Sequence, residues 1–224
     1  MTTDSVPPRR NAAKADETRE LILAAAEQRF ASKGFYPTRL EDIAEDVGIS
    51  RTAVIYHFQD KETLYNAVLE KLFTQLNDRI SAALALPAEL PERVEGAVEA
   101  WLDFAGERPT LMRLFMREVA GSENGLRPDV QKFVEPMFAR LIEALSEGQR
   151  SKAFRAIDPV QFWSILAGAS MFFIMDAPLL ASAETLVRLD TYKQELKRVA
   201  RNMLGVDEHL TAKITEAAPP GESK

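Results

Sequence analysis

Along most of this chain, apolar residues recur every three or four positions, which is the period of an α-helix and not of a strand. The segment 16–32 is an example, because its apolar side chains fall on one stripe and Gly34 follows as a stop signal. The stripe consists of Leu21, Ile22, Ala25, Ala26 and Phe30. Convincing alternation of apolar and polar residues is missing from the sequence, so the pattern predicts an all-α protein.

Two short helices are predicted on either side of Gly48. Before it, four apolar residues occupy positions i, i+3, i+4 and i+7 of a two-turn helix; they are Leu40, Ile43, Ala44 and Val47. After it, Ser50 is suited to cap a helix over 51–57, with Val54 and Ile49 facing back into the pair. The small Ala44 allows close approach and Gly48 permits a left-handed bend. The pattern therefore predicts a helix-turn-helix.

Capping signals mark two more helix starts. Thr38 and Glu41 have the spacing of a capping box, in which the threonine oxygen accepts the amide of residue 41 and the glutamate reaches back. Asp60 is placed to cap a long helix that runs from about Lys61 to Ala85. The three predicted N-terminal helices are therefore expected to be followed directly by a long helix.

The second half of the chain begins after a break at Pro87 and Pro91 and is also helical in pattern. The expected helices are 92–106, 109–120, 128–147, 159–175 and 184–204, with Asp158 and Pro159 as cap and first-turn proline of the fourth. The expected parts are a flexible basic arm over 1–15, a three-helix domain over 16–62, a larger helical domain over 63–208 and a loose tail over 209–224.

The helix-turn-helix predicts a DNA-reading surface. In such motifs the first residues of the second helix meet base edges in the major groove; here they are Ser50, Arg51, Thr52 and Ala53. Arg51 can fork onto a guanine edge or clamp a phosphate, and the exposed positions of this helix carry no acid. Phosphate contacts are expected from Thr38, Arg39, Tyr56, His57 and Lys61.

The stretch around residues 50–57 also allows other interpretations, catalytic or purely structural. Ser50 and His57 could form a nucleophile and its base, but seven residues separate them, about two helical turns, and no Gly-x-Ser-x-Gly motif occurs. The helix pair could be a structural corner, His57 a capping residue, and Tyr56 a packing residue. The spacing argues against an enzyme.

Composition narrows the function classes. There is no cysteine and there are two histidines, which argues against disulfides, thiolate chemistry and a metal site. No cofactor is expected. The net charge of −6 disfavours wholesale coating of nucleic acid but permits a local basic face. Arg9, Arg10 and Lys14 could follow a DNA groove or belong to a solvated tail.

The location in the cell is predicted from hydropathy. The N-terminus shows no secretory signal, and the most apolar run, from Trp163 to Met175, is shorter than the ~20 residues that span a bilayer. A cytoplasmic protein without membrane contact is therefore expected.

The run from about Thr18 to Leu69 resembles the DNA-binding domain of the tetracycline-repressor (TetR) family. The similarity covers about a quarter of the chain and includes the G[FY]xxT turn, the DIAxxxGIS core and the HFxxKxxL close, all in register. One position departs from the pattern, because the family's tyrosine is replaced by Ile55 and Tyr56 follows one place later. Such a step turns a side chain by about 100° around the helix axis.

The resemblance implies a ligand cavity in the larger domain, and the second half is rich in the flexible methionines and flat aromatics that suit an apolar or amphipathic effector. The candidate lining residues are Trp101, Phe104, Met112, Phe115, Met116, Phe133, Met137, Phe162 and Met171. The alternative for each of them is ordinary core packing.

The resemblance also implies a homodimer built from the last two helices. Small residues that permit close packing form one stripe with an aromatic, and a second stripe lies on the final helix. The stripes are Ser164, Gly168 and Phe172, and Glu195, Val199 and Met203; the alternative is burial within one chain.

Together these features imply a repressor that an apolar small molecule releases from a palindromic operator. An activator or ligand-independent regulator on the same scaffold remains an alternative, as does a small-molecule carrier that retains a helix-turn-helix.

Overall fold

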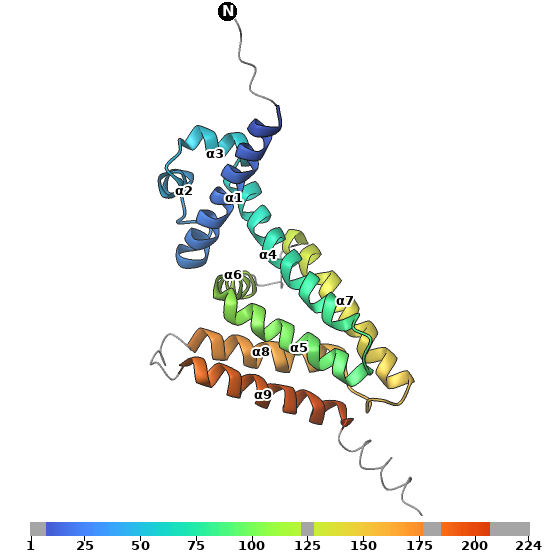
Figure 1. The fold of residues 1–224 in the computed structure, drawn as a ribbon. Coiled ribbons are helices and arrows are strands. Elements are labelled where there is room, and N and C mark those ends of the chain that lie inside the picture. The colour runs from blue at the N-terminus through green and yellow to red at the C-terminus, as the bar shows by residue number, and fades with distance from the viewer. Residues whose placement is uncertain (1–7, 122–127, 177–184, 207–224) are drawn as a thin grey trace, which may run out of the picture. The chain divides into compact units, whose positions relative to one another are not determined.

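The computed structural model describes residues 8–121, 128–176 and 185–206, and every regular element in them is a helix, as predicted (Figure 1). The helices are α1 (Pro8–Lys33), α2 (Leu40–Val47), α3 (Arg51–Phe58), α4 (Lys61–Leu84), α5 (Leu90–Glu107), α6 (Pro109–Ala120), α7 (Pro128–Arg150), α8 (Pro159–Asp176) and α9 (Thr185–Leu204).

The chain divides into two compact units. The first comprises residues up to Phe73 together with Thr110–Phe133, and the second comprises Thr74–Pro109 together with the residues from Val134 onward. Helix α4 therefore contributes to both units, and nearly all of α6 belongs to the unit that contains the helix-turn-helix. The predicted functional boundary between 62 and 63 stays a prediction.

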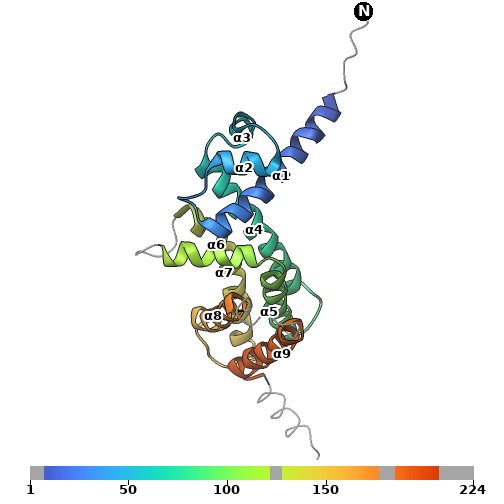
Figure 2. The same cartoon turned by 90° about the vertical axis from the view of Figure 1, so that its left-hand side faces the viewer.

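The first unit is organised around the apolar stripes of α1 to α4. Ile22, Phe30, Ile43, Val54 and Leu64 are fully buried. Burying each such side chain contributes about 1.5–3 kcal/mol, so this core fixes where α2 and α3 lie. In the views of Figures 1 and 2, α2 and α3 lie beside α1 at one end of this unit.

Three expected helix starts, those of α3, α4 and α8, are confirmed by their caps. The Ser50 Oγ accepts the Ala53 amide at 3.2 Å, the Asp60 Oδ1 accepts the Thr63 amide at 2.7 Å, and the Asp158 Oδ1 accepts the Gln161 amide at 2.9 Å. Each cap satisfies an amide that the first helical turn leaves without an intrahelical partner.

Two local expectations are wrong. There is no capping box at α2, because the Thr38 hydroxyl donates to the Gly34 carbonyl at 2.7 Å and the N-cap residue is Arg39, which makes no side-chain cap. Helix α1 begins at Pro8, not near residue 16, so that residues 8–15 of the expected arm are helical. The alanines of this segment are strong helix formers. Residues 1–7 and the expected tail over 209–224 lie outside the described residues.

In the second unit, α5 packs against α8 and α9, as the side-by-side helices of Figure 1 show. Three ion pairs join α5 to α9 at four-residue intervals on both helices: Lys193–Asp103, Lys197–Glu99 at 2.8 Å and Arg201–Glu95 at 2.6 Å. Their spacing places one charged row of each helix opposite the other, which fixes the antiparallel register.

Candidate nucleic-acid interface

Helix α3 presents one face to the core and leaves the other free. Val54 and Phe58 are buried, whereas Arg51, Thr52 and Tyr56 are exposed. Ser50 is exposed and Ala53 is half-buried at the start of the helix. The N-terminal end of α3 thus offers the polar residues that the sequence assigned to base contacts.

The turn that aims α3 depends on Gly48. Its φ of 73° and ψ of 34° lie in the left-handed region, and its amide donates to carbonyls of α2. A Cβ here would meet no atom within 4 Å, so that backbone conformation and not crowding favours glycine. This confirms the expected left-handed bend between the two helices.

A shallow hollow of about 360 Å³ lies beside the start of α3. Three cations and two acids line it together with polar and apolar residues: Tyr36, Thr38, Arg39, Leu40, Glu41, Arg51, Ile55, Gln59, Asp60 and Lys61. Within it, the Arg51 Nε lies 2.9 Å from the Glu41 Oε1, and the Arg39 Nε lies 3.7 Å from the Glu41 Oε2. The expected base-reading arginine is therefore ion-paired in the protein alone.

Two of the expected phosphate contacts also have structural partners. Thr38 is buried and its hydroxyl donates to the Gly34 carbonyl, so this side chain is not exposed to a phosphate as the sequence predicted. The Lys61 ammonium donates to the carbonyls of Tyr36 and Thr38 at 3.3 and 3.2 Å and lies 4.5 Å from the centroid of the Phe35 ring. Arg39 is exposed and keeps donors for a phosphate.

The departure at Ile55 and Tyr56 has a structural consequence. Ile55 lies in the hollow with Arg51, while Tyr56 points to solvent with 83% of its surface exposed and meets His57 edge to face at 5.4 Å. Tyr56 is thus not a core packing residue in this chain. His57 is half-buried in the last turn of α3.

Carboxylates of this unit are held ionised by their partners. The Arg29 guanidinium makes two bonds of 2.5 Å to Asp46, which lowers the pKa of that carboxyl and joins α1 to α2. Hydrogen bonds from Thr63 lower the pKa of Asp60 at the start of α4. Both acids therefore fix the ends of the helices that carry the interface.

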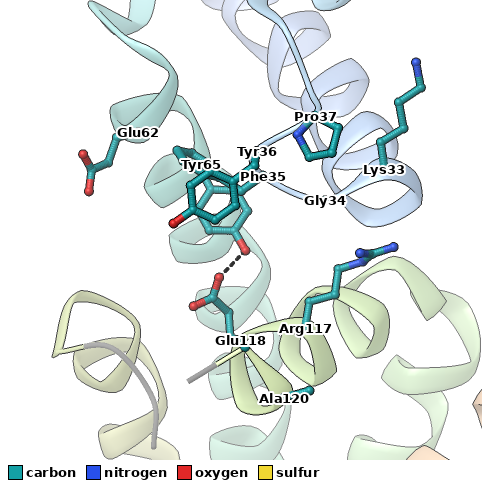
Figure 3. Close-up of a pocket in the computed structure, with 11 residues that line it drawn as sticks. Lys33, Gly34, Phe35, Tyr36, Pro37, Glu62, Tyr65, Arg117, Glu118 and Ala120 are labelled. Carbon is teal, nitrogen blue, oxygen red and sulfur yellow. Dashed lines mark hydrogen bonds between the residues drawn. The ribbon is translucent and has the colours of Figure 1, made fainter. Parts of the chain in front are cut away.

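Helix α6 is tied to the same unit by polar contacts. The Tyr65 hydroxyl donates to the Glu118 carboxylate at 2.5 Å (Figure 3). The Arg117 guanidinium donates to the Ser32 carbonyl at 3.1 Å, and Thr110 hydrogen-bonds Glu27. A Cβ on Gly34, whose φ is 90°, would come within 3.1 Å of Arg117. A pocket of about 800 Å³ in this unit has Gly34, Tyr65, Arg117 and Glu118 among its lining residues.

The predicted ligand residues are not one cluster within one unit. Trp101, Phe104, Met137, Phe162 and Met171 belong to the second unit and are buried there. The remaining four, Met112, Phe115, Met116 and Phe133, belong to the first unit, where Phe115 packs edge to face on Phe73.

An aromatic group in the second unit includes two residues that the sequence list missed. Trp101 meets Trp163 edge to face at 4.9 Å, and Phe138 meets Trp163 at 5.9 Å. The Trp101 indole N–H is buried and has no hydrogen-bond partner among the residues that the structure describes. Buried donors without a partner are rare, so this one is suited to a ligand's acceptor.

The expected dimer stripes lie on the surface of the single chain. Ser164, Gly168 and Phe172 are exposed, and Phe172 leaves 72% of its surface uncovered. On α9, Glu195 and Val199 are exposed and Met203 is half-buried. Burial within one chain therefore does not account for the α8 stripe.

Across the described ranges, no helix has the length and apolarity to cross a membrane. The same ranges hold no group of three or more metal-ligating side chains.

Comparisons with known proteins agree with this geometry. Residues 22–68 match the family model of bacterial regulatory proteins of the tetR family, and residues 91–205 match a tetracyclin repressor-like C-terminal domain. The chain is 26% identical over 159 residues to the HTH-type transcriptional activator FasR of Mycolicibacterium smegmatis, covering 66% of this chain and 73% of that protein.

Two solved structures share the fold. A TetR family transcription regulator from Marinobacter aquaeolei superposes with a TM-score of 0.72 at 18% identity, covering 86% of this chain and 98% of the other. The fatty acid degradation regulator FadR from Bacillus halodurans superposes with a TM-score of 0.66 at 17% identity, covering 87% of this chain and 97% of the other. The two family matches together span most of the chain, which belongs to the TetR family and is a transcription regulator with a helix-turn-helix DNA-binding domain, not an enzyme.

Proposed function

We propose that this protein is a ligand-responsive repressor that binds a palindromic operator as a homodimer and is released by an apolar or amphipathic small molecule. The observation that carries the proposal is the start of α3, where Ser50, Arg51 and Thr52 are exposed above the buried Val54. A helix held in this way can enter the major groove with its N-terminal residues against base edges.

The exposed stripe of α8 supports the homodimer. A single short recognition helix contacts few base pairs, and two-fold symmetry doubles those contacts on a palindromic site. Phe172 would be covered by a second copy, with Ser164 and Gly168 allowing close approach.

The aromatic group around Trp101 supports an effector that combines an apolar body with a hydrogen-bond acceptor. The two tryptophans offer flat apolar surface, and the Trp101 N–H offers one directed donor. The structural similarity to a regulator named for fatty acid degradation makes straight-chain fatty acids a reasonable first probe.

Helix α4 supports a coupling between ligand binding and DNA binding. It begins at the expected phosphate contact of Lys61 and continues into the second unit, so a ligand that displaces its later turns would change the position of α3. A coupling of about 1–3 kcal/mol changes operator affinity roughly 5- to 150-fold.

An activator on the same scaffold is the second candidate, because the relative FasR is named as one. The direction of regulation follows from where the operator lies relative to the promoter, and transcription from that promoter with and without the protein distinguishes the two.

The proposal is tested by fluorescence anisotropy on duplex DNA selected in vitro for binding. Arg51→Ala and Lys61→Ala are expected to weaken binding, and if neither does, the site assignment is wrong. Because both tryptophans of the chain lie in the aromatic group, their fluorescence reports on it directly. Fatty acids should change this fluorescence and weaken DNA binding, and Trp101→Phe should reduce both effects.

A further inference from the structure

We propose that Glu41 is a specificity-determining residue of the DNA-binding surface, which acts through Arg51. Its carboxylate would hold the Arg51 fork in one orientation and reduce the attraction of that arginine for phosphates of any sequence. The inference rests on the proposed role of Arg51 as a base-reading residue.

The pair is positioned by two helices whose inner faces are buried. Glu41 lies in the first turn of α2, next to the buried Leu40, and Arg51 is the first residue of α3, three residues before the buried Val54. Their Nε–Oε1 distance is 2.9 Å, although about half of each side chain is exposed. Exposed ion pairs contribute little to folding stability. The expected consequence of this pair is therefore its effect on the orientation and charge of the Arg51 guanidinium.

The geometry leaves the arginine able to read a base. The Glu41 carboxylate is ion-paired with Arg51 on the Nε side of the guanidinium, and the described residues accept no hydrogen bond from its two terminal nitrogens, which stay available to a base. Two parallel donors are what a guanine edge requires. An arginine attracted to a carboxylate on its Nε side would therefore meet the groove with its two terminal nitrogens turned toward the bases.

The charge of Glu41 has the opposite effect on phosphates. Of the two acids that line the hollow, Asp60 accepts the Thr63 amide as a helix cap, whereas Glu41 faces Arg39 and Arg51. A carboxylate at this place offsets positive charge that would otherwise bind DNA regardless of sequence. Sequence-independent affinity would be lowered more than affinity for the correct site.

The experiment compares Glu41→Gln with Glu45→Gln, which removes the same charge from an exposed position of α2 one turn further on. Binding to random-sequence duplex and to the selected duplex is measured by anisotropy between roughly 50 and 200 mM salt. The Glu41→Gln variant should bind random duplex more tightly than Glu45→Gln does. Its salt slope should be steeper by about 0.9 per subunit, the value of one added phosphate contact, and its preference for the selected duplex should fall.

Repeating the comparison in an Arg51→Ala background distinguishes failure of the proposed role of Glu41 from failure of the proposed DNA site. There, the loss of preference for the selected duplex caused by Glu41→Gln should disappear because Arg51 is gone, and only the smaller gain in random-duplex affinity from the released Arg39 should remain. Equal effects of the two glutamine variants on the wild-type background, with Arg51→Ala still weakening binding, would overturn the role of Glu41 alone. If Arg51→Ala leaves binding to the selected duplex unchanged, the proposed DNA site itself fails.

Discussion

The Lys61 ammonium lies over the face of the Phe35 ring, 4.5 Å from its centroid, at the first residue of α4. A positive charge is unfavourable at a helix N-terminus. The carbonyls of Tyr36 and Thr38 and the ring offset that cost, so Lys61 joins α4 to the loop before α2.

Replacing Lys61 with methionine should therefore lower the free energy of unfolding by about 1 kcal/mol, the usual contribution of such hydrogen bonds, and also weaken DNA binding. Urea unfolding measures the first effect and anisotropy the second. Lys14→Met, on an exposed position of α1, is the control for stability and should leave it unchanged. A Lys61→Met variant as stable as wild type would show that these bonds do not stabilise α4.

The pair of Arg29 and Asp46 predicts a dependence of stability on pH. Because Arg29 lowers the folded-state pKa of Asp46 below its usual value of 3.8, the stabilisation is present above that value and is lost as pH falls through the folded-state pKa. Urea unfolding should show that Asp46→Asn is less stable than wild type at pH 6, with a difference that shrinks below pH ~4. Asp78→Asn, on an exposed position of α4, should show no such convergence.

The charged rows of α5 and α9 predict that exchanging the charges of one pair restores stability lost in the single variants. Lys197→Glu and Glu99→Lys should each destabilise the protein because each places like charges opposite one another, and the double exchange should recover up to about 1 kcal/mol. Combining Glu99→Lys with Arg198→Glu should recover nothing, since Arg198 pairs with Glu195. Recovery in that second combination, seen by thermal unfolding, would contradict the assigned register.

The exposed Phe172 predicts the site of self-association. Phe172→Glu should shift the protein from dimer to monomer, because two carboxylates would meet in an apolar contact. Sedimentation analysis measures the mass. Leu86→Glu, at another exposed apolar residue, is the control and should remain dimeric. A dimeric Phe172→Glu variant would place the interface elsewhere.

The order of helices was predictable from sequence because their ends carry local signals. Ser50, Asp60 and Asp158 cap the helices that follow them, and Gly34 and Gly48 adopt the left-handed backbone expected after a helix. Each signal depends on residues within one turn, which the sequence shows directly.

The sequence did not predict which of several competing partners a side chain would bond, nor which distant helices would meet. The Thr38 hydroxyl bonds to a carbonyl of the preceding turn instead of an amide of α2, and Glu41 pairs with Arg51 across the helix pair. Gln59 turns the chain with φ 62° and ψ −59°, and no glycine marks the place. The Trp101–Trp163 contact joins helices distant in sequence, so periodicity could show that both are buried but not that they meet.

The most direct test of the central claim is the dependence of DNA affinity on salt for the wild-type protein and Arg51→Ala on the selected duplex. A DNA-binding surface built around α3 predicts that log affinity falls linearly with log salt, because bound cations displace counterions from phosphates. Arg51→Ala should lose most of the preference for the selected duplex over random duplex. A flat salt dependence, or an unchanged preference in Arg51→Ala, would contradict the account.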